Sequence, residues 1–142
     1  MKLSTESRYA VLALTVLARE PSGTVIEAGT VAERADVPTA FLAKIFAKLT
    51  RHGILISHRG RVRGYELARP ADELTLRALL EAIDGPDLFE RCVFWTETCD
   101  ASNPCPLHPA WQHLRPTITA AMEGTTLAQV SEEAVRTSGR TR

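Results

Sequence analysis

The chain has 142 residues, of which 44% are hydrophobic and 24% are charged, and its formal net charge at pH 7 is zero. This length suits one compact domain with an added helical arm, and the composition is that of an ordinary soluble protein able to bury a core. The odd count of three cysteines argues against a framework of disulfide bonds.

The zero net charge hides a split between the two halves of the chain. Residues 1–69 carry eleven Lys and Arg against six Asp and Glu, a balance of +5, whereas residues 70–142 carry six against eleven, a balance of −5. This asymmetry predicts that the first half meets a polyanion and that the second half does not.

A helix is predicted over residues 5–19, and its apolar face consists of Tyr9, Leu12, Val16 and Leu17. Lys2 precedes its apolar run, as in a secretory signal, but charged residues interrupt the approach and no small-residue cleavage site follows. The run is also too short to span a bilayer. We therefore expect a buried N-terminal helix in a cytoplasmic protein with no membrane partner.

Two helices joined by a short turn follow. The first is predicted near residues 27–35, and the second begins near Pro38, whose fixed φ suits an early helical position, and stops at Gly53. The second helix has basic side chains away from an apolar stripe of Phe41, Leu42, Ile45, Phe46 and Leu49. Such a pair of helices is typical of a helix-turn-helix.

A two-stranded hairpin is predicted directly after this pair. Residues 54–58 and 65–67 are short and favour strands, and the segment between them reads RGRVRG. Its two glycines supply the φ values that a turn requires, and three arginines crowd its tip. A helix-turn-helix followed by such a hairpin is the plan of a winged helix.

The basic side chains of these elements predict contact with double-stranded DNA. Residues 44–69 hold seven Lys and Arg and one acid, and the three arginines of the wing repel one another unless an anion meets them. A narrow minor groove or a line of phosphates supplies that anion, while the start of the second helix faces base edges in the major groove. The predicted DNA-binding residues are Thr39, Ala40, Phe41, Ala43, Lys44, Lys48, Arg51, Arg59, Arg61 and Arg63.

The acidic half begins with another helix, which carries Leu76, Leu79, Leu80 and Ile83 at helical spacing. Residues 85–109 are irregular and rich in proline. A helical pattern returns near residue 110, with Pro116 as a point of kinking or a starting point, and Thr126 is a predicted cap for a last short helix. Residues 137–142 are predicted to form a flexible tail.

All three cysteines of the chain lie in the proline-rich segment. Cys92, Cys99 and Cys105 are separated by six and five residues, and two residues separate Cys105 from His108. These gaps are wider than those of a zinc ribbon, and they suit a loop around a bulkier inorganic centre such as an iron–sulfur cluster. Two alternatives remain open for the cysteines, a zinc site with three cysteines and one histidine and a thiol–disulfide switch. For His108, the alternative to a ligand role is that of a helix cap.

Taken together, these stretches resemble the IscR/NsrR-type iron–sulfur transcriptional regulators of bacteria over nearly the whole chain. ESRYAVLAL resembles their opening helix, and VAERADVPTAFLAKIFAKLTRHGILISHRGRVRGYELARPADELTLRALLEAIDG resembles their helix-turn-helix, wing and following helix. The three cysteines and CPLHPAW resemble their cluster loop running into a long dimerisation helix.

The resemblance implies a mainly α fold with a small β-hairpin, in which a winged helix-turn-helix domain is joined to a long C-terminal dimerisation helix. Residues 1–84 would form the DNA-binding domain, residues 85–109 the cysteine-rich cluster-binding loop and residues 110–136 the dimerisation helix region. A homodimer bound to a palindromic operator is implied as well.

The resemblance also implies the ligands. The cluster, of the 2Fe-2S or the 4Fe-4S type, would be held by Cys92, Cys99, Cys105 and His108. NsrR-like members instead use an aspartate from the partner subunit, and this chain has Arg8 at that place, with Glu6 as a distant substitute.

The sequence therefore predicts a dimeric DNA-binding transcriptional regulator, a repressor by family analogy, whose DNA affinity is controlled by an iron–sulfur cluster that senses redox state, nitric oxide or iron–sulfur status. The alternatives are a winged-helix regulator with a zinc or thiol–disulfide switch and a small iron–sulfur redox protein. The four histidines form no catalytic motif with serine or aspartate, so we expect neither an enzyme nor a small-molecule substrate.

Overall fold

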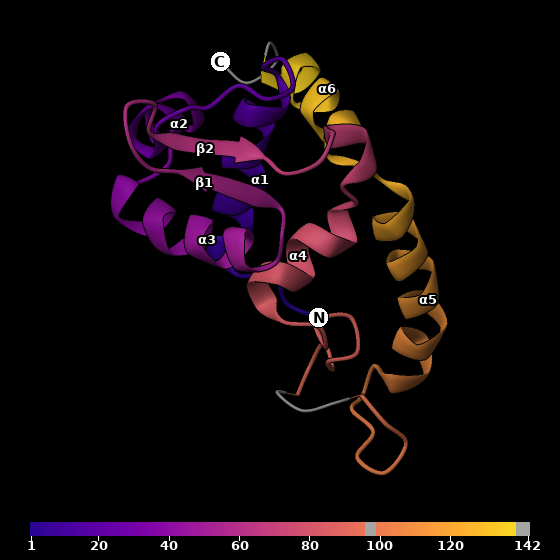
Figure 1. The fold of residues 1–142 in the computed structure, drawn as a ribbon. Helices are drawn as coiled ribbons and strands as arrows, with labels where there is room; N and C mark the ends of the chain where they lie inside the picture. Colours follow the sequence, from indigo (N-terminus) through magenta and orange to yellow (C-terminus); the bar gives the residue numbers. More distant parts are fainter. Residues whose placement is uncertain (96–98, 139–142) are drawn as a thin grey trace.

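The computed structural model describes residues 1–95 and 99–138 (Figure 1). Its helices and strands are, in chain order, α1 (Thr5–Ala18), α2 (Ala28–Ala35), α3 (Thr39–Arg51), β1 (Leu55–His58), β2 (Gly64–Leu67), the 3-10 turn η1 (Ala71–Glu73), α4 (Leu76–Asp84), α5 (His108–Gly124) and α6 (Leu127–Ser138). The predicted mainly α fold with one small hairpin is confirmed. Within the described residues, no helix is both long and apolar enough to cross a membrane.

The main core joins α1, α2, α3, α4 and the hairpin around fully buried side chains. Leu14 of α1 and Phe46 of α3 are each completely buried, and the ring of Phe46 meets the edge of Tyr65 in β2 with centroids 4.7 Å apart. Burying a side chain of this size contributes about 1.5–3 kcal/mol to folding. The helix-turn-helix and the hairpin thus share one buried core with α1 and α4.

Two apolar side chains lie outside the core in spite of their helical spacing. The prediction that Leu12 belongs to the buried face of α1 is wrong, since it is 40% exposed, and Phe41 of α3 is 49% exposed. The buried face of α1 is set by its packing against α2, α3, α4 and α6, and it runs through Ala10, Ala13 and Leu14 instead.

The turn between α2 and α3 depends on a left-handed residue. Asp36 ends α2 with φ of 54° and ψ of 49°, and its amide donates to the carbonyls of the last turn. Aspartate tolerates this conformation better than most side chains. Pro38 is the N-cap of α3 rather than its first helical residue, and Val37 between them is buried in the core.

The wing is an antiparallel hairpin that is pinned to the body of the domain. Leu55 pairs with Leu67 and His58 pairs with Gly64, so the arginine-rich segment forms the tip. Tyr65 exchanges two backbone hydrogen bonds with Ile26, of 2.9 and 3.0 Å. This antiparallel bridge attaches the segment before α2 to the outer side of β2.

The acidic half wraps around this body. The segment before α4 pairs with the connection between α5 and α6, because Leu127 N donates to Leu74 O and Leu76 N donates to Thr125 O, both at 2.8 Å. Thr126 caps α6 as predicted, since its hydroxyl accepts from the Gln129 amide at 3.3 Å. α6 then packs on α1, while α5 runs beside α4, on the side of the molecule away from α2 and α3 (Figure 1).

Two sequence-based boundaries differ from the structure. Pro116 lies inside α5, which begins earlier than residue 110, at His108. α6 extends to Ser138, so the first two residues of the predicted tail are helical, and residues 139–142 of that tail lie outside the described residues.

Candidate functional site

The first candidate surface is the exposed side of α3 together with the tip of the wing. Nine of the ten residues predicted to bind DNA are exposed, and the tenth, Lys48, is half-buried. The start of α3 presents Thr39, Ala40 and Phe41 to solvent, as a helix entering a major groove would require. Packing of α3 on β1 places the wing beside the helix (Figure 1).

The side chains at the wing tip carry cationic charge without a compensating acid. Arg59, Arg61 and Arg63 are exposed and form no ion pair with any residue that the structure describes. Val62 lies between them and is 65% exposed. Behind the tip, the His58 ring contacts the Glu66 carboxylate at 2.8 Å. The tip is therefore available to an external polyanion.

The two lysines of α3 are in a different situation. The Glu6 carboxylate in the first turn of α1 contacts Lys44 Nζ at 3.0 Å and Lys48 Nζ at 2.6 Å. The hydrogen bond from Lys48, and then that from Lys44, lowers the pKa of Glu6. Sequence analysis missed this pairing because no local pattern joins residues some 40 positions apart. The pairing also means that Glu6 points toward α3 of the same chain and not toward the cysteine site of a partner subunit.

An aromatic contact supports the exposed start of α3. The rings of Phe41 and Tyr9 lie with their centroids 5.8 Å apart, and the guanidinium carbon of Arg8 is 5.4 Å from the centroid of Tyr9. Tyr9 thus holds an apolar ring at the surface of α3. The sequence offered the aromatic residues but not their proximity.

The second candidate site is formed by the three cysteines and His108, the four residues predicted as cluster ligands. Cys92, Cys99 and Cys105 are buried, unbridged and gathered in one cluster with Trp111 of α5. His108, the first residue of α5, is also buried, and its Nδ1 lies 3.3 Å from the Cys99 sulfur. All four predicted ligands therefore converge at the start of α5.

The local backbone distinguishes the thiols. The amides of Phe94 and Trp95 both donate to the Cys92 sulfur at 3.3 Å. The bond from Trp95, with help from that of Phe94 and from the Cys105 thiol, lowers the pKa of Cys92. Burial, and next the same contact with Cys92, raises the pKa of Cys105. The Cys92 thiol is therefore more readily deprotonated than the Cys105 thiol to the thiolate form that binds metal.

The loop that carries Cys92 is anchored to the DNA-reading body. Arg91 donates from Nη2 to the Asp84 carbonyl and to the Asp87 carboxylate, both at 2.7 Å, and the Met1 amino group donates to the Arg91 carbonyl at 2.9 Å. At the end of α4, Asp84 Oδ2 accepts from the Ser7 hydroxyl at 2.7 Å and from the Ser4 amide at 3.1 Å. The cysteine loop, α4 and the first turn of α1 are thus directly linked.

Thiolates and a histidine are residue types that hold iron–sulfur clusters, so the chemistry of these four side chains is compatible with such a group. Within the described part of the chain, no three or more His, Cys, Asp and Glu side chains stand close enough to hold one metal ion. The buried indole Nε1 of Trp111 has no hydrogen-bond acceptor among the described residues, and cluster sulfurs accept such bonds.

Comparison of the sequence with known proteins identifies the family of the chain. The Rrf2 family model, described as an iron-dependent transcriptional regulator, matches residues 3–133. A protein of Mycobacterium tuberculosis named as an HTH-type transcriptional regulator is 36% identical over 92% of this chain and 81% of its own length. The HTH-type transcriptional regulator IscR of Yersinia pestis is 28% identical over 92% of this chain and 79% of its own.

A solved structure agrees with these sequence relatives. The oxidized form of Staphylococcus aureus CymR superposes with a TM-score of 0.72 at 25% identity, over 93% of this chain and 97% of that one. The relatives are transcriptional regulators and not enzymes, and the winged helix found here is the DNA-binding element of such proteins. The chain belongs to the Rrf2 family of DNA-binding transcriptional regulators.

Proposed function

We propose that the protein is a homodimeric repressor whose affinity for a palindromic operator is set by an iron–sulfur cluster bound to Cys92, Cys99, Cys105 and His108. The observation that carries the proposal is the convergence of three free, buried cysteines and a buried histidine beside the end of α4. When bound, the cluster would supply a centre that can gain or lose electrons or react with nitric oxide, and whose loss would itself be a signal.

The proposal divides the chain by role. Residues 1–84 read DNA, residues 85–109 hold the cluster, and residues 110–136 form the dimer. The exposed start of α3 supports the first assignment, as do the exposed wing arginines, which pair with no acid within residues 1–95 and 99–138. The four converging ligands support the second.

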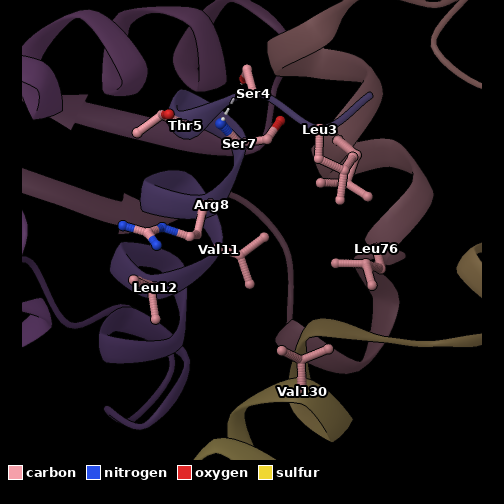
Figure 2. Close-up of a pocket in the computed structure, with 10 residues that line it drawn as sticks. Leu3, Ser4, Thr5, Ser7, Arg8, Val11, Leu12, Leu76 and Val130 are labelled. Carbon is pink, nitrogen blue, oxygen red and sulfur yellow. Dashed lines mark hydrogen bonds between the residues drawn. The ribbon is translucent and has the colours of Figure 1, made fainter. Parts of the chain in front are cut away.

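The dimer assignment is supported by an uncovered apolar groove between α1, α4 and α6 (Figure 2). Its volume is about 530 Å³, and Figure 2 shows Val11 of α1, Leu76 of α4 and Val130 of α6 pointing into it. Leu12 on its rim and Leu114 on α5 are 40% and 54% exposed. A second copy that covers these apolar faces would remove them from water.

The link from the cluster to DNA would pass through contacts that this chain already makes. Arg91 ties the start of the cysteine loop to the end of α4, and Asp84 ties that end to Ser4 and Ser7 of α1. A change in the loop would then move α1, on which α3 packs. A coupling of 1–3 kcal/mol between the sites changes DNA affinity about 5–150-fold.

The cofactor is tested by anaerobic purification, a visible absorption spectrum, and counts of iron, acid-labile sulfide and zinc per chain. We expect a brown protein in which iron and sulfide are present in similar amounts. Replacement of Cys92 by serine should abolish the colour, because it removes one of the proposed thiolate ligands, whose pKa is lowered toward the metal-binding form. A colourless wild-type protein with stoichiometric zinc would contradict the proposal.

A thiol switch is the second candidate, and a specific contact favours it. The Cys92 and Cys105 thiols lie in one buried cluster, each shifts the pKa of the other, and the pKa of Cys92 is lowered, chiefly by the Trp95 amide. The related CymR of S. aureus has been solved in an oxidized form. Three titratable thiols, no metal, and loss of two of them on oxidation would support this candidate in place of the cluster.

A further inference from the structure

Glu6 is an acidic side chain next to the basic surface of α3, the helix proposed to bind DNA. It projects from the first turn of α1 toward α3, and its two carboxylate oxygens are divided between two lysines. Oε1 contacts Lys44 and Oε2 contacts Lys48, at 3.0 and 2.6 Å. Both lysines lie on the helix that faces the DNA.

The environment makes this carboxylate an effective partner for the two ammonium groups. The side chains of Glu6 and Lys48 are only 23% and 25% exposed, whereas that of Lys44 is 67% exposed. Charges that are partly shielded from water by the protein interact more strongly than charges in bulk water. One negative charge thus offsets part of two positive charges on α3, while the wing arginines have no such partner among the described residues.

We propose that Glu6 competes with DNA phosphates for Lys44 and Lys48, and that it thereby sets the affinity and the salt dependence of DNA binding. A phosphate that approaches α3 must draw these lysines from the carboxylate or share them with it. The competition weakens binding to DNA of any sequence, so base contacts decide a larger share of the affinity. This inference rests on the proposed DNA-binding role of α3.

The test is the substitution Glu6→Gln, with Glu33→Gln as the matched control. Glu33 is an exposed acid on α2, so both variants change the net charge equally, but Glu33 pairs with neither lysine. Dissociation constants for a random-sequence duplex would be measured by fluorescence anisotropy over a series of salt concentrations. Circular dichroism would first establish that each variant melts as a folded protein.

Glu6→Gln should tighten binding to the random duplex roughly twofold to fivefold per subunit, the range that exposed ion pairs support. It should also steepen the logarithmic salt slope by up to about one unit per freed lysine. In a Lys44→Gln/Lys48→Gln background, adding Glu6→Gln should change neither quantity. If Glu6→Gln and Glu33→Gln have the same affinity and the same slope, the inference is overturned.

A second comparison is available if Glu6→Gln proves too unstable to study. With Glu6 in place, Lys44→Gln should reduce DNA affinity less than Arg61→Gln, since Arg61 is exposed and forms no ion pair with an acid in the described part of the chain. Equal losses from the two substitutions would also overturn the inference. A wild-type protein that binds no DNA at any salt concentration would overturn the proposed function as well, which separates the two failures.

Discussion

At the scale of single residues, Gly64 shows how one position fixes the wing. Its φ is +139°, which side chains rarely adopt, and a Cβ placed there would lie 2.3 Å from the Ile26 carbonyl oxygen. The absence of a side chain lets the hairpin approach the segment before α2 and form the two Tyr65–Ile26 hydrogen bonds. The sequence predicted a turn glycine at this position, but the turn alone does not explain it.

Gly64→Ala should therefore lower the free energy of unfolding by about 3 kcal/mol or more, through backbone strain and the clash with Ile26. Urea denaturation would measure the loss. Gly60→Ala is the control, because Gly60 also has a positive φ, of +125°, but a Cβ there meets nothing within 4 Å. Similar losses in the two variants would show that close packing on Ile26 is not the cause.

At the scale of elements, periodicity and turn residues predicted the helix-turn-helix, the hairpin and the helix α4. The stripe through Leu42, Ile45 and Leu49 is buried as the helical period requires. Periodicity gave the wrong environment for Leu12 and Phe41, because it identifies a face but not which neighbouring element covers that face. The four cysteine-site residues were predicted because they are close together in the sequence.

Contacts between distant elements were beyond such patterns. The bonds from Ser7 to Asp84 and from Lys48 to Glu6 span 77 and 42 positions, and either depends on how α1 packs against its neighbours. No propensity or spacing in the sequence encodes these pairings. They are nevertheless the contacts that join the cysteine loop, α1 and α3.

Asp84→Asn should weaken the link between α4 and α1, because the neutral amide oxygen accepts hydrogen bonds from Ser4 and Ser7 less strongly than a carboxylate. We expect a loss of about 1–2 kcal/mol in the free energy of unfolding. We also expect a smaller ratio between the DNA affinities of the cluster-loaded and cluster-free proteins. Thermal melting and anisotropy titrations would measure the two effects, with Asp72→Asn in η1 as the control. An unchanged affinity ratio would exclude Asp84 from the coupling.

At the scale of the whole molecule, the charge split corresponds to a physical division. The basic half forms the winged helix, and the acidic half supplies the cysteine loop and the two C-terminal helices. The acidic half also carries apolar side chains that the single chain leaves uncovered, such as Leu114. A partner subunit would account for them.

Leu114→Asp should convert a dimer into monomers, since it would place a carboxylate in the apolar contact that α5 is proposed to make. Sedimentation velocity would measure the change. Val62→Asp is the control, because Val62 is equally apolar and 65% exposed but lies on the wing. A dimer that survives Leu114→Asp would place the interface elsewhere.

The most direct test of the account is the DNA affinity of one protein preparation with and without its cluster. An operator would first be selected from a random library under anaerobic conditions, and gel shifts would then be run at one fixed salt concentration. The account predicts that the dissociation constants of the loaded and stripped proteins differ by about fivefold or more. Equal affinity of the two forms for the same operator would contradict it.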